Sequence, residues 1–262
     1  MYTTMNSKLS IILTPLLLSL VLPVNIQTAF AEGQADSKDK DYSVGRMGDP
    51  AGVNPEEFEF SSAETKLWLS NHLKNVSSPV KLFYEFEKKG SFEEGIVDSV
   101  ILEIIHDNDD GTKNTHMEFF TEERNQSIPE EVTRNIIGNP VLGIYLQGDA
   151  YEMDRLTEGH WRYFHRKIKL ALTEDKANVE PVSIDFDGNT VPGEKITISP
   201  YTRDPRRSQF EIFADKRYEF ILSEEIPGTL YQIKTLVPDN SDSANGPLIE
   251  ETLTLREVKS SS

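Results

Sequence analysis

The chain has 262 residues and a formal net charge of −17 at pH 7, because 44 acidic side chains outnumber 27 lysines and arginines. Such an acidic chain repels phosphate backbones and anionic membrane surfaces, so we expect no nucleic-acid partner and no broad adhesion to lipid headgroups. The sequence contains no cysteine. This excludes disulfides, a thiol nucleophile and a cysteine-linked lipid anchor, and it means that stability must come from a hydrophobic core.

Residues 1–31 have the pattern of a secretory signal peptide. Lys8 precedes an apolar run over residues 9–24, and the small-x-small sequence Ala-Phe-Ala follows at 29–31. The run is interrupted by Pro15 and Pro23 and is shorter than the roughly 20 residues that span a bilayer. We therefore expect cleavage after residue 31 and no stable membrane insertion. With no disulfides and no anchor, the simplest location is a bacterial periplasm.

Residues 32–60 are rich in glycine, aspartate, serine and proline, and this composition predicts a flexible N-terminal arm. A short helix is expected next, because Ser61 or Ser62 stands three or two residues before Glu64 in a capping-box arrangement. The apolar residues of this segment fall on roughly one helical face: Leu67, Trp68 and Leu73.

The sequence VKLFYEFEK, residues 80–88, alternates with the two-residue repeat of a half-buried strand. Its predicted inner face consists of Val80, Leu82, Tyr84 and Phe86. Two further strands are expected over residues 95–105 and 115–121, and the Asp110-Gly111 pair between them is a strong hairpin signal. Three consecutive antiparallel strands are therefore predicted.

A helical region follows. Asn139-Pro140 is a helix cap with proline at the first helical position, and the pattern continues over residues 141–147. After Gly148-Asp149 a second helical pattern covers residues 150–174, and we expect it to bend or break near Gly159.

Six more strands are expected in the C-terminal part, with turns at Asp187-Gly188-Asn189 and Pro227-Gly228. They cover residues 182–186, 194–201, 208–213, 216–223, 229–237 and 247–258. About nine strands, a short first helix and a central helical insert predict one α+β domain over residues 61–258, with a short tail at 259–262. The connections are too short for helical crossovers, so the strands must pair mostly antiparallel.

This order of elements resembles the LolA/LolB-type periplasmic lipoprotein carriers and their lipid-binding relatives. The resemblance lies in the signal peptide, the helix that runs into SSPVKLFYEFEKKGSFEEGIVDSVILEI, and the later strands interrupted by helices, over residues 62–120 and 182–258. It implies a curved, unclosed antiparallel sheet, or half-barrel, with helices over the concave face and an apolar cavity for acyl chains between them. It includes no short motif, so no site residue is transferred from it.

A metal site is one alternative for the predicted hairpin. Counting outward from its turn places His106 and His116 near each other, with Asp107 and Asp109 close by. Histidines on adjacent strands often face opposite sides, which favours a solvated acidic turn instead. The spacing from Asp107 does not fit a calcium loop, because glycine falls at position 5 instead of 6. We expect neither a metal nor a cofactor.

No catalytic motif stands out. We find no convincing G-x-S-x-G or S-x-x-K nucleophile motif and no glycine-rich phosphate loop. Carboxylate pairs are too common among 44 acids to indicate general acid–base chemistry. We therefore expect a protein that is not an enzyme.

The sequence GHWRYFHRKIKLAL, residues 159–172, is the most distinctive segment. At 100° per residue its buried face carries Trp161 and Phe164, whereas Arg162, Arg166 and Lys169 form a separate cationic stripe. One interpretation is that these cations are solvated or paired with the chain's own acids. The other is that the helix offers aromatics to a cavity and cations to an anionic headgroup at its mouth.

From these patterns we expect an exported binding protein for a hydrophobic or amphiphilic small ligand. The predicted ligand-binding residues are Trp161, Phe164, Arg162, Arg166, Tyr84 and Phe86. The alternative is an acidic accessory protein that docks onto another periplasmic or envelope protein by electrostatic recognition.

Overall fold

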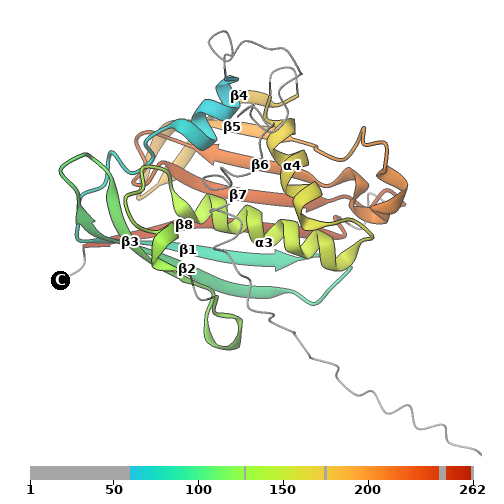
Figure 1. Cartoon of the computed structure of the whole chain (residues 1–262), viewed down its shortest axis with the longest axis horizontal. Coiled ribbons are helices and arrows are strands. Elements are labelled where there is room, and N and C mark those ends of the chain that lie inside the picture. Colours follow the sequence, from blue (N-terminus) through green and yellow to red (C-terminus); the bar gives the residue numbers. More distant parts are fainter. Residues whose placement is uncertain (1–59, 127, 174–175, 242–245, 261–262) are drawn as a thin grey trace, which may run out of the picture.

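The computed structural model describes residues 60–126, 128–173, 176–241 and 246–260. Within them, eight strands form one antiparallel sheet in the order β3-β2-β1-β8-β7-β6-β5-β4 (Figure 1). The strands are β1 Val80–Lys89, β2 Ile96–Asp107, β3 Lys113–Phe119, β4 Asn178–Phe186, β5 Asn189–Ile198, β6 Arg217–Leu222, β7 Leu230–Val237 and β8 Ile249–Ser260. The predicted signal peptide and the arm up to residue 59 lie outside the described residues.

The inner face of β1 is the predicted one. Val80, Leu82, Tyr84 and Phe86 are buried, and the residues between them are more exposed, as the two-residue repeat of a strand requires. The β2–β3 hairpin forms around the predicted turn at 110–111. The α+β class and the unclosed antiparallel sheet are therefore confirmed.

The sheet does not close, because β3 and β4 lie at opposite edges. The outer edge of β3 is partly covered by single bridges, Lys113 to Ile136 and Phe119 to Gln126. In β4, Pro181 removes one backbone donor and is typical of edge strands. The two halves of the chain meet at the centre of the sheet, where β1 pairs with β8.

The predicted strand over residues 208–213 is wrong. This segment forms the 3-10 turns η5, Arg207–Gln209, and η6, Glu211–Asp215. Phe210 and Phe213 are both buried, and a spacing of three puts both side chains on one face of a 3-10 turn but on opposite faces of a strand. The sheet accordingly has eight strands where the sequence predicted about nine.

The first helix begins as predicted, with a capping box between Ser61 and Glu64. It consists of α2, Ser62–Glu64, and the π-helical turn η2, Thr65–Leu69. Leu73 lies beyond its end but is fully buried. Two further 3-10 turns follow β3: η3, Glu122–Arg124, and η4, Glu130–Val132.

The central insert forms two helices, α3, Pro140–Leu156, and α4, Trp161–Ala171. The chain breaks near Gly159, as predicted, but the interruption expected at Gly148-Asp149 is wrong because α3 continues through it. Figure 1 shows both helices over one face of the curved sheet, with α3 across the centre and α4 towards β5 and β6. No helix among the described residues has the length and apolar character needed to span a membrane.

Candidate functional site

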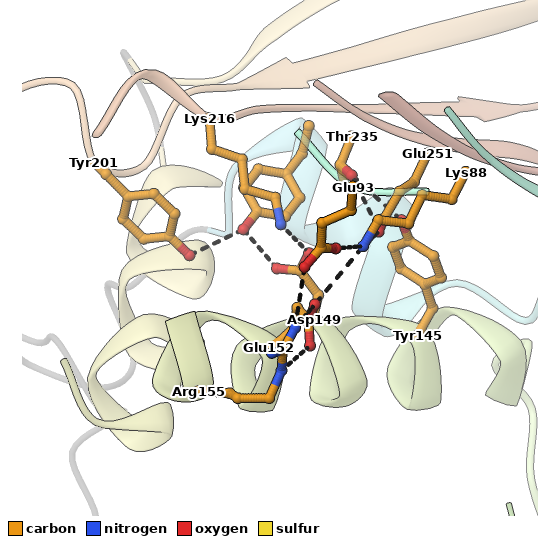
Figure 2. A network of polar contacts seen from close by, with 11 residues as sticks. Lys88, Glu93, Tyr145, Asp149, Glu152, Arg155, Tyr201, Lys216, Thr235 and Glu251 are labelled. Atoms are coloured by element: carbon orange, nitrogen blue, oxygen red, sulfur yellow. Dashed lines mark hydrogen bonds and ion pairs between the residues drawn. The ribbon is translucent and has the colours of Figure 1, made fainter. Parts of the chain in front are cut away.

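A buried ion pair joins α3 to the sheet. Asp149 lies on α3, and Lys216 lies just before β6; their side chains are 2% and 5% exposed and in direct contact. Asp149 also accepts a hydrogen bond of 2.7 Å from the Tyr218 hydroxyl, which lies 3.0 Å from the Tyr201 hydroxyl (Figure 2). Buried charges are tolerated when they are paired and hydrogen-bonded in this way.

A second group of charges continues from this pair towards β1. The Lys88 amino group lies 2.6 Å from Glu93, 3.4 Å from Glu251 and 3.7 Å from Glu152. Burial alone would lower the pKa of Lys88, but attraction to these three carboxylates outweighs it and raises that pKa. Arg155 donates two hydrogen bonds, of 2.6 and 3.0 Å, to Glu152 on the same helix.

Hydroxyl groups complete the arrangement. Tyr145 on α3 donates a hydrogen bond of 3.2 Å to Glu251 on β8, and Thr235 on β7 donates another of 3.2 Å to the same carboxylate. Burial, followed by nearby carboxylates, raises the pKa of Tyr145 well above its ordinary value, so its hydroxyl stays a donor. We call the residues of Figure 2 the polar network: Lys88, Glu93, Tyr145, Asp149, Glu152, Arg155, Tyr201, Lys216, Tyr218, Thr235 and Glu251.

The polar network therefore connects α3 with β1, β6, β7 and β8. Chemically it combines opposite charges that satisfy one another and tyrosines that remain protonated. Sequence reasoning missed it, although one signal was present. Asp149 stands four residues after Tyr145 and four before Met153 on the buried side of α3, where a carboxylate needs a cationic partner from elsewhere in the fold.

The contact of α4 with the interior is aromatic. Phe164 is fully buried, and its ring centroid lies 5.4 Å from that of Tyr201 and 5.2 Å from that of Phe210. These three rings form what we call the aromatic cluster. Gly159 permits this packing, because a Cβ at that position would stand 2.1 Å from the Phe164 ring.

The outer side of α4 is cationic. Arg162, Arg166 and Lys169 are exposed, and the Arg162 guanidinium stacks 4.5 Å above the half-buried ring of Trp161. Burial and the nearby charge of Lys169 lower the pKa of His165 from 6.5 to about 4, so this imidazole is neutral at pH 7.

On the other flank of α4, Asp204 fixes the helix to the loop after β5. The Lys167 amino group lies 2.7 Å from this carboxylate, and the Tyr163 hydroxyl donates to it at 2.7 Å. The Arg206 guanidinium lies 4.9 Å above the Tyr163 ring. Lys167 of α4 thus pairs with an acid of the described fold, whereas Arg162, Arg166 and Lys169 are exposed on the outer side of the helix.

The six residues predicted to bind a ligand do not form one continuous lining. Trp161 and Arg162 are in contact at the start of α4, and Arg166 is exposed one turn later. Phe164 belongs to the aromatic cluster.

The two predicted residues on β1 have other neighbours. Tyr84 accepts a hydrogen bond of 2.9 Å from the Asn139 amide at the start of α3. The Phe86 ring lies 4.8 Å from that of Phe120. The inner face of β1 and the aromatic cluster are therefore separate parts of one interior.

The predicted hairpin does not bring its histidines into register. His106 lies opposite Asn114, whereas His116 lies opposite Glu103, and both histidines are exposed. Asp107 instead pairs with Lys113 at 2.9 Å. Across the described residues, no three histidine, aspartate or glutamate side chains are grouped so that they could hold a metal ion.

No protein-family model matches this chain, and no curated protein sequence matches it either. Among solved structures, the chain is similar to a LolA superfamily protein from Nitrosomonas europaea. The two are 8% identical, and the match covers 76% of this chain and 94% of the other with a TM-score of 0.22. A likeness at this TM-score adds nothing to the fold described above, which rests on the strand order of the chain itself.

Proposed function

We propose that this protein is an exported binding protein, and not an enzyme, that takes an apolar or lipid-like ligand between its concave sheet and its two covering helices. The observation that carries this proposal is the two-sided character of α4. One side of α4 packs aromatic and aliphatic side chains over the open sheet, and the other side offers Arg162, Arg166 and Lys169. An anionic amphiphile would match both sides, because its acyl chain is apolar and its headgroup is negatively charged.

The two helices differ in how easily they could admit a ligand. In the arrangement described, Phe164 and its neighbours occupy the space beneath α4. An acyl chain could replace such apolar contacts with similar ones, because dispersion and hydrophobic burial are not directional. Displacing α3 would instead separate buried charges such as Asp149 and Lys216, and breaking a buried pair is strongly destabilising. The proposal therefore has α4 move while α3 stays.

Native mass spectrometry of gently purified protein, followed by organic extraction, tests for a bound amphiphile. Uptake of a fluorescent fatty acid should then weaken in the variant Arg162→Gln/Arg166→Gln. The matched control is Arg134→Gln/Arg256→Gln, which removes the same charge from exposed positions elsewhere. Absence of uptake by the unchanged protein, together with the absence of a co-purifying amphiphile, would overturn the proposal.

The second candidate is an acidic accessory protein that docks onto another exported protein. It is favoured by the net charge of −17 and by the large cluster of buried apolar side chains that packs together inside the described fold. A pull-down from periplasmic extract at low and high salt tests it. Loss of one specific partner at high salt supports docking, and no partner at either salt contradicts it. Cell fractionation tests the location that both proposals require.

A further inference from the structure

Two exposed cations of α4 have no acidic partner among the residues that the structure describes. Arg166 and Lys169 are three residues apart, so they share one side of the helix. Neither forms an ion pair with a carboxylate of the chain that the structure describes, whereas Lys167 on the flank pairs with Asp204. In a chain where acids outnumber bases 44 to 27, an unpaired cationic surface attracts the chain's own acidic segments.

The described chain begins beside the C-terminal end of α4. The Ser61 hydroxyl donates a hydrogen bond of 2.5 Å to the carbonyl of Leu172, and Ser61 is 5% exposed. The capping box with Glu64 fixes the same residue. Ser61, next to the start of the described chain, therefore lies about one helical turn from Lys169.

The sequence directly ahead of Ser61 is strongly acidic. Residues 55–60 read PEEFEF, with carboxylates at Glu56, Glu57 and Glu59 and no basic residue. Its charge is opposite to that of the α4 surface, and the two are covalently joined. A tether of a few residues gives a high effective concentration, so even a weak contact is populated.

The acidic segment is long enough to reach both cations of α4. A helix rises about 1.5 Å per residue, so Lys169 and Arg166 lie roughly 4.5 and 9 Å from Leu172 along the axis. An extended chain spans about 3.3 Å per residue, so Glu59 can reach roughly 7 Å and Glu56 roughly 17 Å from Ser61. The acidic segment is thus long enough to follow α4 past both cations.

We propose that residues 55–59 dock along the exposed side of α4, with Glu56, Glu57 and Glu59 against Arg166 and Lys169. The surface fits an acidic peptide, and the occupant is the chain's own N-terminal segment. Because the partners are exposed, the contact is weak and sensitive to salt. The docked segment covers the cationic stripe and competes with any other anion for it.

The absence of cysteine allows a specific test. A nitroxide is attached at Asn54→Cys in the protein isolated after export, and broadening of α4 amide signals is measured by NMR. We expect broadening that extends to Arg166 and the N-terminal half of α4 at low salt. It should fall sharply at about 1 M salt, where the Debye length is about 3 Å.

Three charge variants of the labelled protein test the proposal. Glu56→Gln/Glu57→Gln/Glu59→Gln should lose most of the broadening in the N-terminal half of α4. The matched control, Asp36→Asn/Asp39→Asn/Asp41→Asn, removes the same charge farther from Ser61 and should keep it. Equal broadening in the labelled protein without charge changes, in the glutamate variant and in the aspartate control would overturn the proposal. So would the absence of broadening in the protein without charge changes. Arg166→Gln/Lys169→Gln should reproduce the glutamate result, and circular dichroism confirms that each variant is folded.

Discussion

Helices α3 and α4 cover the same sheet but are held to it by different forces. The C-terminal half of α3 is bound by buried charges, with Asp149 against Lys216 and Glu152 near Lys88. The inner side of α4 is bound by rings, with Phe164 packed against both Tyr201 and Phe210. A charge pair has one correct arrangement, whereas apolar packing tolerates substitution by other apolar groups.

The charges around the two helices also differ. Next to α3, opposite charges attract one another, as the raised pKa of Lys88 shows. Along the outer side of α4, like charges lie close together, and Lys169 contributes to the lowered pKa of His165. The difference is consistent with our proposals that α3 stays in place when a ligand enters and that the outer surface of α4 binds an anionic segment.

The largest effect is expected from breaking the ion pair beneath α3. Lys216→Met should reduce the free energy of unfolding by about 3–5 kcal/mol, because it leaves the Asp149 carboxylate buried and unpaired. Adding Asp149→Leu should recover a large part of that loss. Urea denaturation measures both variants, and Lys74→Met, at an exposed ion pair, is the control with an expected change within about 0.5 kcal/mol. A double variant as unstable as the single one would contradict this account.

An effect of similar size, but without such a rescue, is expected beneath α4. Phe164→Ala should reduce the free energy of unfolding by about 3–5 kcal/mol, because it removes a fully buried ring. Trp161→Ala should reduce the free energy of unfolding by less, since that ring is only half-buried and stacks with Arg162. Thermal denaturation of both variants checks the order, and the reverse order would show that Trp161 is the main apolar contact of α4.

A smaller effect is expected where α3 begins. The Asn139 side chain accepts a hydrogen bond of 3.1 Å from the Val141 amide and donates to the Tyr84 hydroxyl at 2.9 Å. Asn139→Ala should reduce the free energy of unfolding by about 1–2 kcal/mol, the range for a lost helix cap. Asn139→Ser keeps a capping acceptor but loses the amide donor to Tyr84 and to the Gly228 carbonyl, so its loss of stability in urea denaturation should be smaller. An equal loss would assign the effect to those donated hydrogen bonds.

The smallest effect concerns the charge of His165. Its pKa in the folded protein is about 4 against 6.5 in an unfolded chain, so the unfolded state binds the proton first as the pH falls. The stability contributed by the neutral imidazole is fully present above pH 6.5 and is lost as the pH falls to about 4. Lys169→Gln should raise the pKa of His165 part of the way towards 6.5 and so narrow the pH range over which this stability is lost.

NMR titration of the His165 ring measures that change. Arg166→Gln is the control, because it removes a neighbouring positive charge that is not a cause of the shift. If the pKa of His165 stays at its original value in Lys169→Gln, burial alone sets it.

Local patterns in the sequence predicted much of this fold. Alternation marked the inner face of β1, the capping box marked Ser61, and Asn139-Pro140 marked the start of α3. The apolar and cationic sides of α4 also followed from its spacing. These features depend on residues within a few positions of one another, so their energetics can be read locally.

The tertiary structure alone decided what those elements contact. Nothing in the sequence near residues 80–89 specifies pairing with residues 250–260, yet β1 and β8 join there and bring Lys88 to Glu251. The sequence at Gly148-Asp149 predicts an interruption of the helix, but α3 continues through it. The charge of Asp149 is balanced there by Lys216, which lies far along the chain. The physical reason is that burial of a charge or pairing of a strand is governed by partners distant in sequence, and their contribution exceeds local propensity.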